Sequence, residues 1–184
     1  MKKIILSLTV VLCLATSVQA QKYFTRAAHI SFYSDAPTEK IEAHNNSVTA
    51  ITDTETGRVE FAALIKAFEF EKALMQEHFN ENYMESSEYP KAVFKGEFTD
   101  FDAKKLNTDG NYTARVEGEL TMHGVTNPVT TEAAFTVKNG TVSATAAFKV
   151  LVADYKIEIP TVVRDNIAKE VEIQVKAEMT EFGK

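Results

Sequence analysis

The chain lacks the residues on which several classes of protein depend. Its 184 residues include no tryptophan and a single cysteine, Cys13. One cysteine cannot build a disulfide framework or a structural thiolate site, so the fold must be stabilised by an ordinary apolar core. HExxH, GxSxG and glycine-rich phosphate-loop motifs are also absent. The sequence therefore gives no support to the enzyme classes that these motifs mark.

Basic residues are scarce as well. The chain has 20 lysines and arginines against 26 acidic residues, a formal net charge of −6, and it has no basic run. Such a surface argues against binding to nucleic acid, and against electrostatic attachment to anionic lipid headgroups. It does not disfavour neutral, apolar ligands.

The first 20 residues have the three parts of a signal peptide. Two lysines follow the first methionine, an apolar run spans residues 4–15, and small residues precede Ala20. We expect cleavage after Ala20 and a periplasmic or secreted protein. The apolar run is shorter than the roughly 20 residues that span a bilayer, and Cys13 lies inside it, which disfavours an uncleaved span and a lipoprotein anchor. The expected mature domain, 21–184, keeps 18 basic and 26 acidic side chains, a formal charge of −8.

Alternation with a period of two recurs along the mature chain and predicts β-strands. The clearest example is the pair of segments 111–122 and 129–137. The connection between them, 123–128, predicts a hairpin in which Gly124 can take positive φ and Pro128 starts the second strand. The remaining predicted strands are 23–34, 43–53, 58–68, 91–102, 141–152 and 168–180. These make eight candidate strands, most with one apolar face.

One segment, 69–90, breaks the alternation. Met75 and Phe79, like Leu74 and His78, are four residues apart, the spacing that places side chains on one side of a helix. We expect a helix at about 71–84. Because a parallel α/β sheet would need helices between most strands, a single inserted helix favours an all-β fold.

Eight antiparallel strands can close into a barrel or split into a sandwich. Closure removes exposed edges, and we predict an all-β, eight-stranded antiparallel barrel with one inserted helix. The predicted inner face mixes large residues such as Phe24 and Phe148 with small ones such as Ala63 and Gly118. This mixture is compatible both with an apolar slot and with a filled core.

Two motifs resemble signatures of a known family. Residues 120–129, LTMHGVTNPV, resemble the hallmark turn of the YceI-like proteins, and 89–94, YPKAVF, resemble that family's second signature. The order of signal peptide, strands, helix and motifs matches too, so the resemblance covers essentially the whole mature chain. The chain departs from the family pattern in its first strand and at 153–160, where many members carry Arg-x-x-Phe-Gly. The resemblance implies an exported lipocalin-like barrel that binds a polyisoprenoid or similar long apolar lipid without a cofactor.

For a non-catalytic carrier of this kind, apolar burial inside the barrel would supply the affinity. We expect the contacts to come from the inner walls and from a helix that covers one opening. The predicted lipid-binding residues are Phe32, Phe61, Ile65, Leu74, Met75, Phe79, Phe94, Phe98, Val116, Met122, Phe135 and Phe148.

Four histidines are the candidates for a catalytic or metal-binding function in place of lipid binding. His123 could be a metal ligand or an acid–base group, although a hydrogen bond to the turn's own backbone explains it more simply. His78 and Glu81 share a helix side and could bind a metal weakly, but a solvated acidic face is the simpler interpretation. For His29 and His44, without obvious partners, we expect structural or surface roles. The competing hypotheses are thus an envelope enzyme using His123 or His78, with or without a metal, and a filled barrel whose acidic surface binds another protein.

Overall fold

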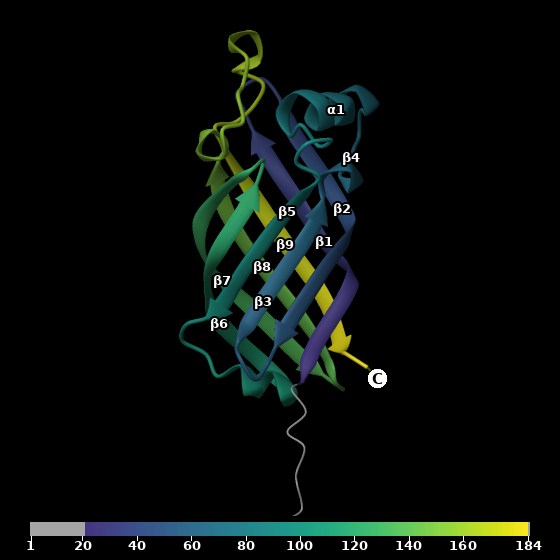
Figure 1. The fold of residues 1–184 in the computed structure, drawn as a ribbon, viewed down its shortest axis with the longest axis vertical. Coiled ribbons are helices and arrows are strands. Elements are labelled where there is room, and N and C mark those ends of the chain that lie inside the picture. Colours follow the sequence, from purple (N-terminus) through teal and green to yellow (C-terminus); the bar gives the residue numbers. More distant parts are fainter. Residues whose placement is uncertain (1–20, 184) are drawn as a thin grey trace, which may run out of the picture.

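Residues 21–183 are described by the structure, a computed structural model, and they form a β-barrel (Figure 1). The expected signal peptide, 1–20, lies outside these residues. The strands are β1 (Lys22–Asp35), β2 (Lys40–Asp53), β3 (Arg58–Leu64), β4 (Glu69–Phe70), β5 (Lys91–Phe98), β6 (Gly110–Met122), β7 (Val125–Lys138), β8 (Thr141–Leu151) and β9 (Glu170–Glu181). The helical elements are α1 (Ala73–His78), a π-helical turn (Phe79–Tyr83) and 3₁₀ turns at Ile65–Ala67, Ala103–Asn107, Val152–Tyr155 and Thr161–Val163.

Eight of the strands close into a ring. Their order is β1-β9-β8-β7-β6-β5-β3-β2, the β1–β2 pairing closes the ring, and every pairing is antiparallel. The two-residue strand β4 pairs with β2 beside the ring. The predicted eight-stranded antiparallel barrel is therefore confirmed. Within residues 21–183, none of the helices has the length and apolar character that a membrane crossing requires.

The two ends of the barrel differ. One end carries α1, β4 and the segment 152–169, and we call it the mouth (Figure 1). At the opposite end, which we call the closed end, the 3₁₀ turn Ala103–Asn107 inserts the fully buried Leu106. Phe101 packs there against Phe98 and Phe135, with ring centroids 5.6 and 6.4 Å apart. Apolar side chains thus fill the closed end, and the room inside the barrel lies toward the mouth.

The first strand corrects one prediction. Phe24 was expected on the inner face, but register shifts between Thr25 and Ala28 and between Ala28 and Ile30 change which side chains point inward. Tyr23 is buried instead, and Phe24 packs outside against Phe182 at 5.7 Å. Extra residues in a bulge reverse the alternation, and a period-two pattern does not register them.

Two predicted strands end earlier than expected, and the α-helix is shorter. The strand predicted at 58–68 ends at Leu64 and continues as a 3₁₀ turn, and the one predicted at 91–102 ends at Phe98. The α-helix covers only Ala73–His78 of the predicted 71–84, because the chain widens into the π-helical turn at Phe79. That turn changes the angular spacing of side chains, so a uniform helix was the wrong expectation.

Candidate functional site: an apolar cavity below the mouth

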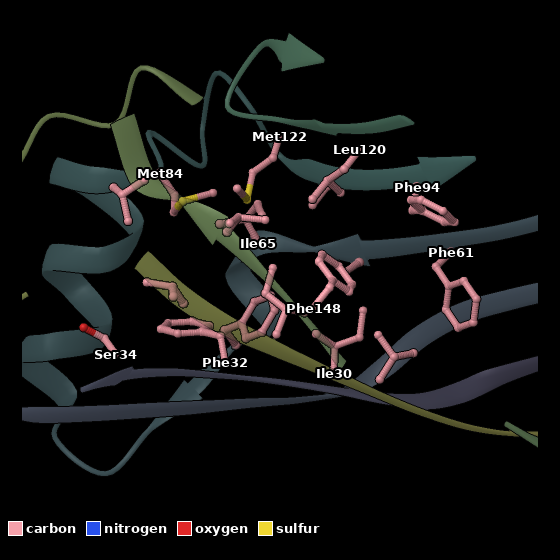
Figure 2. Close-up of a pocket in the computed structure, with 18 of the residues that line it drawn as sticks. Ile30, Phe32, Ser34, Phe61, Ile65, Met84, Phe94, Leu120, Met122 and Phe148 are labelled. Atoms are coloured by element: carbon pink, nitrogen blue, oxygen red, sulfur yellow. The ribbon is translucent and has the colours of Figure 1, made fainter. Parts of the chain in front are cut away.

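A cavity of about 330 Å³ lies inside the barrel, between the mouth and the filled closed end (Figure 2). Nearly all of its lining is apolar, and all eight ring strands contribute directly to the walls. Wall residues include Ile30 and Phe32 (β1), Ile41 (β2), Phe61 (β3), Phe94 (β5), Leu120 and Met122 (β6), Ala133 (β7), Phe148 and Val150 (β8), and Ile173 (β9).

Four phenylalanines, which we call the aromatic cluster, form the part of the site nearest α1. Phe79 is at its centre, with ring centroids 5.4 Å from Phe32, 5.8 Å from Phe68 and 5.0 Å from Phe70. Each of these rings also lines the cavity. Phe79 is the first residue of the π-helical turn, so this local widening accompanies the packing of the helix onto the barrel.

The structure places ten of the twelve predicted lipid-binding residues along the cavity. They are Phe32, Phe61, Ile65, Met75, Phe79, Phe94, Val116, Met122, Phe135 and Phe148. Leu74 is outside the lining, with 61% of its surface exposed. Phe98 is also outside, packed against Phe101 and Phe135 at the closed end. Contact of the ten residues with a lipid stays a prediction.

Sequence reasoning missed other lining residues for identifiable reasons. Phe68 was expected at the end of a strand and Phe70 just before the helix. Their convergence depends on the 3₁₀ turn that follows β3. Ile157 and Ile159 lie in the irregular segment after β8, for which no periodicity exists. Leu120 and Ile173 carried a usable signal, because both lie on predicted apolar faces.

The mouth end of the cavity is polar. Glu39 lines it, accepting hydrogen bonds from Asn166 Nδ2 at 3.2 Å and Lys72 Nζ at 3.3 Å. The bond from Asn166, followed by those from Lys72, holds the pKa of Glu39 below its usual value. Ser34 is also at this end, on the far side of the cavity from Phe61 and Phe94 (Figure 2). The cavity therefore joins an apolar interior to a polar end that contains a carboxylate paired with a lysine.

His123 connects three segments around the mouth. Its Nδ1 lies 2.9 Å from the carbonyl oxygen of Tyr155, and its Nε2 lies 2.9 Å from Glu85 Oε2. Its ring also packs edge-on against Tyr89 at 4.8 Å. The expected hydrogen bond to the turn's own backbone was thus wrong, because the partners come from elsewhere in the chain. His123 is absent from the cavity lining, and both ring nitrogens contact oxygen acceptors.

The turn that holds His123 is also tighter than predicted. β6 ends at Met122 and β7 begins at Val125, so only His123 and Gly124 form the connection, both with positive φ. That is the geometry of a two-residue hairpin turn. A Cβ at Gly124 would lie 2.7 Å from the Tyr89 ring, so glycine also allows the two family-like motifs to touch.

The other histidines are dispersed. His78 lines the cavity near α1. His29 and His44, for which no partners were expected, meet across β1 and β2 with Nε2 and Nδ1 3.4 Å apart. Their remaining nitrogens contact Asn46 Oδ1 at 2.7 Å and Glu42 Oε1 at 2.9 Å respectively. Within residues 21–183, no three histidine, cysteine, aspartate or glutamate side chains form a group that could hold a metal ion.

Comparison with known proteins gives a consistent result. The family model of the YceI-like domain matches residues 17–179. No curated protein matches the chain at a significant level. A solved polyisoprenoid binding domain from Saccharophagus degradans, implicated in plant cell wall breakdown, superposes with a TM-score of 0.76 at 14% identity, covering 89% of this chain and 99% of that one.

Two further solved structures share the fold. Burkholderia cenocepacia BcnA has a TM-score of 0.68 at 16% identity, covering 83% of this chain and 96% of its own. The YceI protein of Campylobacter jejuni has a TM-score of 0.62 at 14% identity, covering 77% and 85% respectively. At these identities the three structures establish a common fold.

Proposed function

This chain belongs to the YceI-like domain family, and on that premise we propose that it is an exported, non-catalytic carrier of a polyisoprenoid or similar apolar lipid. The observation that carries the proposal is the apolar cavity of about 330 Å³ inside the barrel. The neighbour described as a polyisoprenoid binding domain supports the choice of ligand class. The signal-like residues 1–20 support a periplasmic or secreted location.

The size of the cavity limits what it can enclose. At roughly 30 Å³ for each water- or methylene-sized group, a volume of about 330 Å³ accommodates a chain of about a dozen carbons. Burying a dozen such groups contributes up to about 10 kcal/mol, at ~0.8 kcal/mol each. Association costs at least about 4 kcal/mol, so an enclosed chain of this length gives only weak binding. Each further pair of buried methylenes would raise affinity roughly tenfold.

The polar end of the cavity limits which lipid headgroups can bind there. Glu39 remains a carboxylate because its pKa is lowered, and the Lys72 ammonium is already paired with it. A phosphate would meet this carboxylate at short range, and like charges repel. A hydroxyl or another neutral donor could instead hydrogen-bond to Glu39 or Ser34. We therefore propose a lipid with a neutral, donating headgroup.

The enzymatic alternative has less support. It depended on His123 or His78, and His123 lies outside the cavity with both ring nitrogens beside acceptors. His78 does line the cavity, but no described carboxylate is hydrogen-bonded to it as the orienting partner of a general base would be. No specific observation favours catalysis over binding.

The first test is native mass spectrometry of the mature protein purified from its own envelope, followed by extraction of whatever is released. A single stoichiometric apolar species would support a carrier and identify its cargo. A protein that is empty and also fails to bind added prenols would refute the carrier proposal.

A matched pair of variants tests where the lipid binds. Ala133→Leu adds volume at a buried wall position of the cavity, whereas Ala134→Leu places the same side chain on the exposed face of β7. We expect Ala133→Leu to weaken farnesol binding at least fivefold, and Ala134→Leu to leave it unchanged. Equal affinities in the two folded variants would place the ligand outside this cavity.

A further inference from the structure

The barrel wall is incomplete between β7 and β8. Their pairing runs from Lys138–Thr141 to Ala133–Ala146 and stops there, although both strands continue toward the mouth. Each strand stays paired on its other side, β7 with β6 as far as Val125 and β8 with β9 as far as Leu151. The segments 128–132 and 147–151 therefore face each other without ladder pairs. We call this opening the window.

The window has defined boundaries. Toward the closed end it begins beyond the Ala133–Ala146 pair. Toward the mouth, Asn127 Nδ2 donates a hydrogen bond of 2.8 Å to the carbonyl oxygen of Asp154. Between these limits, Thr131 Oγ1 donates to the carbonyl oxygen of Ala147 at 3.0 Å. Widening the window would break this side-chain hydrogen bond and no described backbone pair.

The window separates the inner cavity from a groove on the outside of the barrel. Thr131, Phe148 and Val150 line both spaces. The outer groove has a volume of about 760 Å³. Its lining is mixed. Pro128, Val129 and Leu151 are apolar, whereas Glu132, Lys149, Glu170 and Glu172 are charged. The apolar side chains among them offer contacts to a hydrocarbon chain lying along the surface.

We propose that the lipid chain passes through the window, so that its tail lies in the outer groove while its headgroup stays at the mouth. The inference rests on the proposed carrier function and deepens it. A chain much longer than about a dozen carbons exceeds a cavity of about 330 Å³, and the closed end is filled by Leu106 and Phe101. The window is adjacent to the cavity, and it leads to Pro128, Val129 and Leu151, whose apolar contacts would add to the affinity of a long chain.

A reversible cross-link tests the passage. Glu132→Cys with Ala147→Cys places cysteines at the first positions beyond the last β7–β8 pair, in a mature chain that otherwise has none. Thr136→Cys with Ser143→Cys, at a paired position of the same strands, is the control. The probes are farnesol, with 15 carbons, and solanesol, with 45; mass spectrometry confirms each disulfide.

We expect the oxidised window cross-link to weaken solanesol binding at least tenfold and to change farnesol binding less than twofold, with recovery on reduction. The oxidised control should bind both prenols like the unmodified protein. Unchanged solanesol binding in the oxidised window variant would overturn the passage. Failure of the unmodified protein to bind farnesol would instead refute the carrier function, so the two failures are distinguishable.

A second pair of variants keeps the test independent of disulfide formation. Leu151→Asp puts a charge into the groove, at a position that is 46% exposed. The matched control, Leu64→Asp, adds the same charge at a position that is 48% exposed and lines neither the cavity nor the groove. Selective weakening of solanesol binding in Leu151→Asp supports the groove. Equal solanesol affinity in the two variants overturns it.

Discussion

Gly118→Ala should destabilise the barrel wall beside the cavity more than an added methyl group normally does. Gly118 and Gly96 are directly opposite on β6 and β5, and the ring of Phe94 lies over both. A Cβ at Gly118 would lie 2.3 Å from the carbonyl oxygen of Lys95 and 2.5 Å from the Cα of Gly96. Both are backbone atoms, so the strands themselves would have to move apart.

The expected loss is about 3 kcal/mol in the free energy of unfolding, the upper end for overpacked cores, because backbone and not a side chain must move. For a domain of this size, that corresponds to a fall in Tm of roughly 6 to 12 °C. Urea denaturation should show a lower midpoint with an unchanged m-value. Gly140→Ala is the control: no atom lies within 4 Å of its Cβ, and its φ of +76° leaves only a conformational cost of about 1 kcal/mol. A Gly118→Ala protein within 0.5 kcal/mol of the unmodified protein would refute the crowding argument.

Two further predictions concern the mouth. Phe79→Ala removes the central ring of the aromatic cluster and should lower the free energy of unfolding by about 2 to 3 kcal/mol. This is less than the loss for a fully buried phenylalanine, and urea denaturation can measure it. A loss below 0.5 kcal/mol would contradict this packing. Asn166→Ala should raise the pKa of Glu39 toward its ordinary 4.5, observable by carboxyl NMR titration. Because the folded-state pKa is lowered, the stabilisation by the Glu39 carboxylate is present above pH 4.5 and is lost as the pH falls through the folded-state value. An unshifted Glu39 in Asn166→Ala would show that this hydrogen bond does not control its titration.

Period-two alternation was sufficient for the number of strands, because each ring strand exposes one face to solvent and the other to the interior. It failed where the chain inserts residues. The bulges in β1 exchanged the roles of Tyr23 and Phe24, and the 3₁₀ turn after Leu64 turned a predicted strand into the start of the aromatic cluster. Such irregularities depend on cross-strand register, which a single strand's sequence does not contain.

The same limitation explains the misses around the site. His29 and His44 meet because β1 and β2 pair in one particular bulged register, so their contact was not readable from either strand. The window was equally invisible, since β7 and β8 both alternate normally and only their partners differ along their length. Most wall residues could be predicted because burial shapes each strand separately. The window could not be predicted, because it arises from the pairing between two strands.

The segment 152–169 connects these observations to ligand choice. It contributes Ile157, Ile159 and Asn166 to the cavity lining, and the carbonyl oxygen of Tyr155 contacts His123. Asp154 of the same segment accepts the hydrogen bond that limits the window. Part of this segment is also where the chain departs from the family pattern. Since the walls are constrained by the closure of the barrel, while loops tolerate change, differences in ligand among barrels of this fold should be encoded mainly here. Exchanging this segment between two relatives should therefore transfer headgroup preference without altering the barrel.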